Sequence, residues 1–226
     1  MTIYYVSDNF VDSIDYTSGI GGAELSDAAL RERLNLEIKP IRCRYLDPEY
    51  LSTNTYIISN HWTLSPVLKQ KLIQDKNYIL IEHDYQCLPN RNPWDNDPKQ
   101  IVMDVDFVKA AKAVFFQTDC HMSMWQEMPE FRNCKNFYSL ITTTYSKEEL
   151  DIIRKISLNT YASKSFSRKF AVIDNPQPLK GRNRAVNYCL ANSVDFGLVK
   201  LTINRVNFLT DLASYSTLVF LPGTPE

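Results

Sequence analysis

Short apolar runs alternate with helical stripes along the first part of the chain. A continuous apolar run bounded by polar residues is typical of a strand that is buried on both faces. Apolar residues that recur three and four positions apart predict the helices between these runs. The predicted strands cover residues 3–6, 55–59, 78–81 and 113–116. This alternation predicts a parallel sheet with helices on both faces.

Helices are expected between the strands. One follows a loop after the first strand and places Leu25, Ala28 and Ala29 on its buried face. Another covers residues 63–75. Asp104 is positioned to cap a third, because an acidic side chain at a helix start can accept from free backbone N–H groups.

The same alternation restarts near residue 170. Ser146 and Glu149 form a capping box that predicts a helix from about residue 147, and residues 159–169 are polar and basic, as in a linker. Strands are then expected at 170–173, 196–199 and 218–221. The helix after the first of these places Ala185, Tyr188 and Cys189 on one face.

The pattern therefore predicts an α/β protein with two Rossmann-like parts. Residues 1–160 would form the N-terminal domain, and residues 161–226 would form the first part of a second domain. A doubly wound sheet needs further units to cover it, so we expect the chain to stop inside its second domain.

Composition narrows the class of protein. Hydrophobic residues make up 44% and charged residues 23%, enough for a buried core. Lys and Arg number 25 against 26 Asp and Glu, so the net charge creates no strong positive electrostatic field that would favour binding to nucleic acid. No apolar run approaches the roughly 20 residues of a membrane helix, and Met1 is not followed by a secretory signal. A cytoplasmic protein is expected, with peripheral membrane association left open.

The cysteines agree with a reducing compartment. Their number is odd, they are widely spaced and they form no C-x-x-C motif, which argues against a disulfide framework or a structural zinc site. Buried free thiols are expected instead. The five are Cys43, Cys87, Cys120, Cys134 and Cys189.

A glycine-rich turn precedes the first helix. It reads Gly19-Ile20-Gly21-Gly22-Ala23-Glu24, and glycines at a strand-to-helix turn let backbone N–H groups approach a phosphate. Gly21 and Gly22 are thus candidate phosphate-binding residues. The alternative is a tight turn. The turn matches neither the dinucleotide fingerprint nor the P-loop motif.

Histidines follow two predicted strands. His83, with Asp84, comes directly after the strand at 78–81 and opens a proline-rich loop that contains Trp94. His61 comes shortly after the strand at 55–59. Long loops at strand ends often carry function. The alternative is that His83 and Asp84 form a satisfied hydrogen-bonded pair and that His61 is structural.

Two other candidates are expected to lack a chemical role. His121, beside Cys120 at a helix start, is interpreted as non-functional. Asp104 and Asp106 form a D-x-D pair, a pattern whose two carboxylates can hold a divalent ion. Their place at a helix start favours capping, and no metal site is expected.

Several short motifs, taken in order, resemble the retaining glycosyltransferases of GT-B fold that use nucleotide-sugar donors. Each is loose by itself, but together they span nearly the whole chain. The matching segments are Gly21-Gly22-Ala23-Glu24, His83-Asp84, residues 114–119, Lys180-Gly181-Arg182, and residues 218–222 followed by Glu226.

The resemblance implies roles for these residues in a metal-independent, retaining transfer of a hexose-like sugar that needs no cofactor. His83 would touch the sugar or acceptor as the catalytic residue. Lys180, Arg182 and the two glycines would bind the donor phosphates, and Glu226 would bind the donor nucleotide or sugar. Asp84, His61 and Trp94 would lie on the acceptor side. The family's usual Arg has no counterpart at residues 174–176, so the second phosphate-binding cation is either absent or supplied from elsewhere, by Arg182 or Arg184.

The expected partners follow from the same resemblance: a nucleotide sugar and a glycan or lipid-linked acceptor, with no nucleic acid. One alternative is a non-catalytic module that binds a glycan or a protein partner. Another is a Rossmann-like oxidoreductase. The missing fingerprint and the basic segment 38–44, where a ribose-binding acid would be needed, argue against it.

Overall fold

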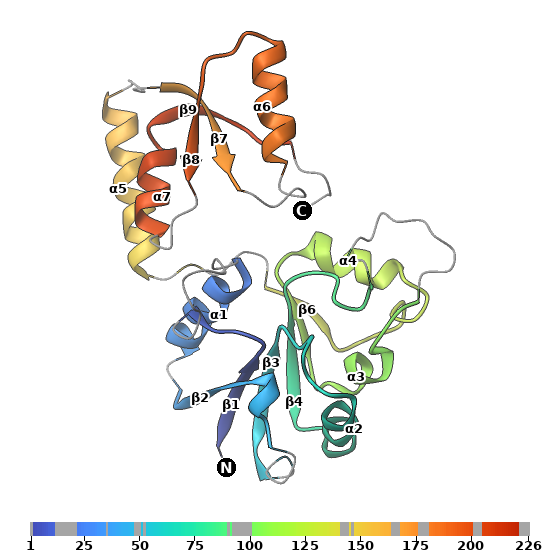
Figure 1. Cartoon of the computed structure of the whole chain (residues 1–226). Helices are drawn as coiled ribbons and strands as arrows, with labels where there is room; N and C mark the ends of the chain where they lie inside the picture. The colour runs from blue at the N-terminus through green and yellow to red at the C-terminus, as the bar shows by residue number, and fades with distance from the viewer. Residues whose placement is uncertain are drawn as a thin grey trace. The chain divides into compact units, whose positions relative to one another are not determined.

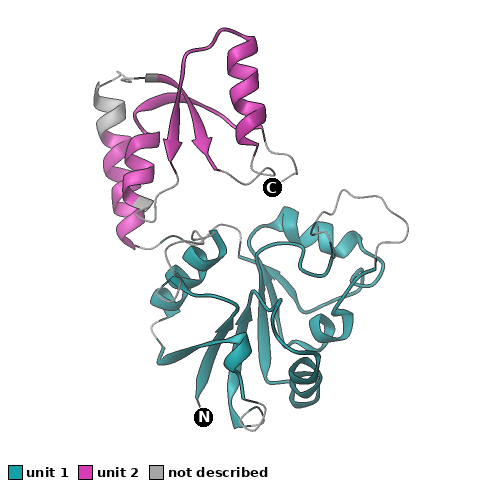
Figure 2. Cartoon of the chain, in the orientation of Figure 1, with its two compact units in different colours: residues 1–145 teal, residues 146–226 magenta. Residues whose placement is uncertain are grey.

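The structure is a computed structural model. It describes residues 2–11, 22–34, 36–47, 51, 53–89, 91, 101–140, 145, 147–163, 168–175, 181–200 and 205–221. The chain divides into two units, residues 1–145 and 146–226 (Figure 2). The helix that begins at residue 147 thus belongs to the second unit, whereas the sequence analysis assigned it to the first domain.

The first unit is built on a six-stranded parallel sheet, with strand order β2-β1-β3-β4-β5-β6 (Figure 1). All five pairs of neighbouring strands are parallel, as predicted. The strand β1 pairs with β2 on one side and β3 on the other, so the order in which successive strands are added to the sheet reverses at β1. The strands are β1 (Ile3–Ser7), β2 (Ile38–Arg42), β3 (Thr55–Ser59), β4 (Tyr78–Glu82), β5 (Val114–Phe116) and β6 (Phe137–Ser139).

Helices cover both faces of this sheet, because successive strand side chains point to opposite sides. Tyr5 and Ile57 belong to a core on the side of α1 (Gly22–Leu34). Val6 and Ile58 belong to a larger core on the other side. That side carries α2 (Pro66–Asp75), α3 (Val105–Ala110) and α4 (Asp119–Glu127) (Figure 1).

The buried face of helix α1 matches the predicted one only at Ala29. Its buried residues are Ser26, Asp27 and Ala29, while Leu25 and Ala28 are only partly buried. The apolar spacing in this helix is thus misleading. A carboxylate faces the sheet here because polar groups at the strand ends hydrogen-bond to it.

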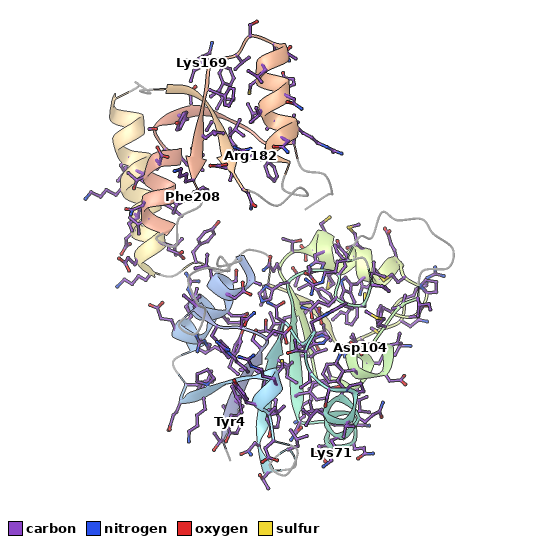
Figure 3. The ribbon with its side chains drawn as sticks, viewed as in Figure 1. Tyr4, Lys71, Asp104, Lys169, Arg182 and Phe208 are labelled. Atoms are coloured by element: carbon purple, nitrogen blue, oxygen red, sulfur yellow. The ribbon has the colours of Figure 1, made fainter. Side chains whose placement is uncertain are left out.

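Asp104 occupies the N-cap position of α3, but its side chain does not cap the helix. Its backbone is left-handed, with φ of 57°, whereas a capping side chain normally needs extended backbone. Its carboxylate, labelled in Figure 3, instead accepts from Nζ of Lys69 in α2, and the two atoms are 2.6 Å apart. The capping interpretation of Asp104 is therefore wrong. The expected mode is seen at α4, where the Thr118 side chain accepts from the N–H of His121.

The second unit holds a three-stranded parallel sheet of order β8-β7-β9. Its strands are β7 (Arg168–Asp174), β8 (Phe196–Lys200) and β9 (Tyr215–Val219). Ala185 and Cys189 of α6 (Arg182–Ala191) pack on one face, with Val172. Phe208 of α7 (Arg205–Leu212) packs on the other, and α5 (Lys147–Ser163) lies beside α7 (Figure 1). As in the first unit, the first strand pairs with a strand on each side.

Several predictions for the second unit need correction. The linker predicted at 159–169 is wrong, since α5 continues to Ser163 and β7 begins at Arg168. The last strand begins at Tyr215, before the apolar run that identified it. Tyr188, predicted to face the core, is 51% exposed. Helix α5 begins at Lys147 as predicted, while Ser146 lies outside the described residues.

The cysteines only partly match their expected burial. Cys43, Cys87 and Cys189 are buried, Cys134 is partly buried and Cys120 is exposed. All five are free thiols. Among the described helices, none is both long and apolar enough to cross a membrane.

Candidate functional site

Side chains from three strands of the first unit converge on the carboxylate of Asp27, which is 1% exposed. Its Oδ1 accepts from Tyr5 Oη at 2.8 Å and from Ser59 Oγ at 3.0 Å. Its Oδ2 accepts from Ser7 Oγ at 3.5 Å. The ring of His83 supplies a further contact to Oδ1 at 2.7 Å. A buried carboxylate needs such partners, because an unpaired one would be expensive to remove from water.

The regular alternation of strand side chains brings these groups together. Ser7 lies two residues after Tyr5, and Ser59 lies two residues after Ile57, so both share the face covered by α1. The same spacing places His83 two residues after Ile81, and Gln117 two residues after Phe115. We call this group the Asp27 cluster: Tyr5, Ser7, Asp27, Ser59, His83 and Gln117.

His83 follows directly on β4 at the carboxyl edge of the sheet, and its side chain is 6% exposed. Its Nε2 faces Asp27, and its Nδ1 lies 2.6 Å from the side-chain nitrogen of Gln117. An ionised carboxylate only accepts, so Nε2 carries a hydrogen. Nδ1 then accepts from the Gln117 amide. This pattern describes a neutral ring with its lone pair on Nδ1.

Opposing effects set the pKa of His83. Burial lowers it, because the charged ring loses water. The hydrogen bond to Asp27 and the charge of Asp27 raise it, and the nearby charges of Glu82 and Asp84 add to this. Together they outweigh burial and hold the pKa of His83 above its ordinary value. His83 is therefore a stronger base than an exposed histidine.

Tyr5 is a fixed donor to the cluster. Burial raises its pKa well above the ordinary value, and the charge of Asp27 and the hydrogen bond to it raise it further. The phenol therefore keeps its hydrogen and donates it to Asp27.

A second polar group lies on the opposite face of β4. Glu82 is fully buried, and its Oε1 lies 3.1 Å from Nε2 of His61, which is 2% exposed. Nδ1 of His61 lies 4.0 Å from Asp104 Oδ2. The His61 backbone N–H donates to Oε1 of Gln86 at 3.1 Å. His61 is thus held in a buried network at the end of β3.

Asp84 does not pair with His83. Its Oδ2 accepts from Nη1 of Arg91 at 3.0 Å, and the Arg91 guanidinium lies 4.9 Å from the ring centre of Trp62. Trp62 is 49% exposed. This charged and aromatic surface group flanks the enclosed cluster at the carboxyl edge. The alternative of a hydrogen-bonded pair between His83 and Asp84 is therefore wrong, because alternation sends their side chains to opposite faces.

His121 lies near the same edge. Its Nε2 lies 3.2 Å from Nε1 of Trp125 and 3.1 Å from the backbone oxygen of Asp84, and the tautomer sets whether it accepts from the first or donates to the second. Burial lowers the pKa of His121, with the charge of His83 contributing, and these effects outweigh the charge of Glu82 and the hydrogen bond to the Asp84 backbone, which raise it. A buried ring that packs against Phe116 and Trp125 fits the structural role expected for it.

The other predicted site residues are distributed over both units. Gly22 is the first residue of α1, with open space around it. Arg182 begins α6, and its Nε donates to Asp174 at the end of β7 (Figure 3). The remaining predicted site residues lie outside the described part of the chain: Gly21, Trp94, Lys180 and Glu226. The structure brings His83, His61 and Asp84 to one edge of the first sheet.

Sequence reasoning missed Asp27, the residue on which the cluster depends. Asp27 lies between Leu25 and Ala28, which were taken as the buried face. One signal in the sequence could have indicated a buried polar partner. Side chains two positions apart in a strand share a face, and Ser59 and Gln117 each lie two positions after an apolar residue of the face covered by α1. Polar residues at such positions need a partner from the covering helix.

No metal centre is found within the described ranges, where no three His, Cys, Asp or Glu side chains are grouped to hold an ion. Comparisons with known proteins give no further guidance. No protein-family model, curated protein or solved structure matches the chain. The candidate site therefore rests on its own geometry and on the sequence motifs.

Proposed function

We propose that the protein is a glycosyltransferase that moves a sugar from a nucleotide-sugar donor to a hydroxyl group of a glycan or similar acceptor, without a metal. The observation that carries the proposal is the position of His83. It stands at the carboxyl edge of a parallel sheet, paired with a buried carboxylate. Open α/β sheets bind their ligands outside this edge, near the point where strand order reverses.

The two-unit architecture supports the proposal. Each unit has a parallel sheet in which the first strand pairs with a neighbour on each side, and helices cover both faces. The GT-B architecture also uses two Rossmann-like domains. In this proposal the first unit holds the acceptor side, with Asp84, His61 and Trp94 as acceptor-side residues. The second unit holds the donor.

Phosphate binding is the chemistry assigned to the second unit. A nucleoside diphosphate gains charge as the bond to the sugar breaks, and fixed cations stabilise that charge. Lys180 and Arg182 would supply the cations, and Glu226 would hold the nucleotide or sugar. The Arg182 side chain is 36% exposed, which leaves part of its guanidinium open despite its bond to Asp174.

A second candidate is a non-catalytic module that binds a glycan or a protein partner. The observation that favours it is the enclosure of His83, since both ring nitrogens already have partners. In that case the Asp27 cluster would serve to join α1 to the sheet. The exposed Trp62 with Arg91 would then offer the contact surface.

A thermal-shift titration separates the two candidates. The chain is titrated with nucleoside diphosphates and nucleotide sugars, with and without Mg²⁺, because a ligand that binds the native state raises Tm. A metal-independent shift that is lost in Lys180→Ala supports the transferase. Lys155→Ala, an exposed lysine of α5, is the matched control and should keep the shift.

The same series shows when the proposal fails. If no nucleotide shifts Tm, and no sugar transfer is detected by mass spectrometry with any donor, the transferase proposal is rejected. A shift with free oligosaccharides but with no nucleotide would favour the binding module.

A further inference from the structure

We propose that a cavity at the amino edge of the first sheet binds a small organic anion that carries carboxylate or phosphate groups. The cavity lies between the last turn of α3 and the segment that joins α4 to β6. This edge is opposite the one that carries His83, so the inference does not depend on the proposed transfer reaction. The residues that line the cavity are Lys109, Pro129, Glu130, Asn133, Cys134, Lys135 and Asn136.

The size of the cavity suits a small molecule. Its volume is about 410 Å³, within the range of roughly 300–1,000 Å³ that is usual for small-molecule sites. A water molecule takes up only about 30 Å³ of the liquid. The space therefore fits a molecule of several carbon atoms better than a single water or a simple ion.

The walls of the cavity are held in place by contacts that need no ligand. The side-chain amide of Asn136 donates to the backbone oxygens of Val108, at 3.3 Å, and Ala111, at 2.9 Å, where α3 ends. The backbone oxygen of Asn136 accepts from the N–H of Val114 in β5 at 2.8 Å. Phe131, which is fully buried, anchors the segment between α4 and β6 in the core. Binding in such a preformed cavity requires little further ordering of the chain.

Unpaired positive charge makes the cavity selective for anions. Among the described residues, neither Lys109 nor Lys135 forms an ion pair. The two lysines come from different elements, α3 and the loop before β6, so their ammonium groups can act on one ligand from two directions. Glu130 is the one acid of the lining, which leaves an excess of positive charge. A cleft lined mainly by one sign of charge concentrates ions of the opposite sign.

Cys134 provides a reporter group inside the cavity. Its thiol is partly buried and lies close enough to Lys109 for the two to interact. Burial raises the pKa of Cys134, and the charge of Lys109 opposes that rise. An anion bound between the lysines would cover the thiol and slow its alkylation.

A titration of the whole chain followed by ¹H–¹⁵N NMR tests for binding and locates it. The probes are sn-glycerol 3-phosphate for a phosphate group and citrate for carboxylate groups. Glycerol is the uncharged control, and sodium chloride keeps the ionic strength constant because salt screens exposed charges. We expect saturable shifts of the amide signals of residues 130–136 with at least one of the two acids and none with glycerol.

The two acids separate the possible ligands. A response to citrate alone assigns a carboxylate ligand, and a response to sn-glycerol 3-phosphate alone assigns a phosphate ligand. The proposal is overturned if neither acid shifts these signals at about 10 mM, ten times a Kd of about 1 mM. Shifts that spread over the surface without saturation would overturn it as well.

Charge variants test whether the lining residues bind the anion. Lys109→Gln and Lys135→Gln should each weaken binding by at least about threefold, as expected for a partly solvated ion pair. Glu130→Gln should tighten binding, because it removes a repulsive charge. Lys112→Gln is the matched control, since Lys112 is exposed and follows α3 but does not line the cavity. If Lys112→Gln weakens binding as much as Lys109→Gln, net charge alone explains the binding and the proposal fails.

Alkylation of Cys134 gives an independent measurement. The Cys120→Ser protein is treated with iodoacetamide at increasing concentrations of the acid that binds, and peptide mapping follows the modification of Cys134. The rate should fall with the same Kd that NMR gives. An unchanged rate at full NMR saturation would place the anion outside the cavity and refute the assignment.

Discussion

The carboxylate of Asp27 and the ring of His83 are 56 residues apart in the chain, yet their side chains meet at 2.7 Å. This contact joins the covering helix α1 to the end of β4. It also gives a buried acid and a buried base complementary partners, so neither is left unpaired in the interior. The same contact thus bears on stability and on the proposed chemistry, and the two can be measured separately.

Loss of the Asp27 carboxylate should destabilise the first unit. In Asp27→Ala, the buried donors of Tyr5, Ser59 and His83 lose their shared acceptor. We expect the free energy of unfolding to fall by about 3–5 kcal/mol, as when one partner of a buried pair is removed. Urea denaturation followed by tryptophan fluorescence measures the change.

Ser7→Ala provides the comparison for that measurement. Ser7 makes the longest contact to Asp27, at 3.5 Å, so its loss should cost about 1 kcal/mol or less. Equal effects of Ser7→Ala and Asp27→Ala would show that the carboxylate is not the centre of the cluster.

His83 should make stability depend on pH. Its pKa is raised in the folded protein, so its contribution is complete below the ordinary value of 6.5 and is lost as pH rises through the folded pKa. In His83→Gln, the decline in stability over this interval should disappear. The measurement is the free energy of unfolding from urea curves at a series of pH values.

His121 supplies a control of opposite sign. Its pKa is lowered in the folded protein, so its contribution is present above 6.5 and is lost as pH falls through the folded pKa. His121→Gln should therefore remove the decline in stability at acidic pH and leave the decline that occurs as pH rises through the folded pKa of His83. If both variants changed the same limb of the curve, the assignment of the His83 pKa would be wrong.

Gly197 should not tolerate a side chain. A Cβ at this position in β8 would lie 2.1 Å from the Tyr215 hydroxyl oxygen and 2.8 Å from the ring. Gly197→Ala should cost about 1–3 kcal/mol in the second unit, as overpacking usually does. Hydrogen exchange of β7 to β9 would report this loss, and Tyr215→Leu should recover part of it. An unchanged exchange pattern would contradict the packing of Tyr215 on Gly197.

The free thiols should differ in reactivity. Cys120 is exposed and should react first with a maleimide in the native protein. Cys43 and Cys87 should be protected, because burial raises the pKa of both thiols and keeps them protonated. Intact mass followed by peptide mapping identifies the labelled positions. Cys120→Ser should abolish the fast phase, whereas fast labelling of Cys43 in the folded protein would contradict its burial.

The pattern of apolar runs and helical stripes predicted the parallel α/β framework. The strand predicted at 55–59 has these same limits in the structure, because a strand buried on both faces leaves a continuous apolar run. The three-residue strand β6 was not predicted, since so short a segment has no readable period. His83 was placed correctly at the end of β4 because its position depends only on where that strand ends.

The contacts of His83 and its neighbours could not be predicted from the sequence, because they depend on the tertiary structure. Asp27 lies on a helix whose spacing favours burial of Leu25 and Ala28, and local preference gives no reason for a carboxylate to face the sheet. Its burial depends on donors that β1, β3 and β4 deliver together at one edge. Such contacts join residues that are distant in the chain, so they arise from the packing of several elements rather than from a local pattern.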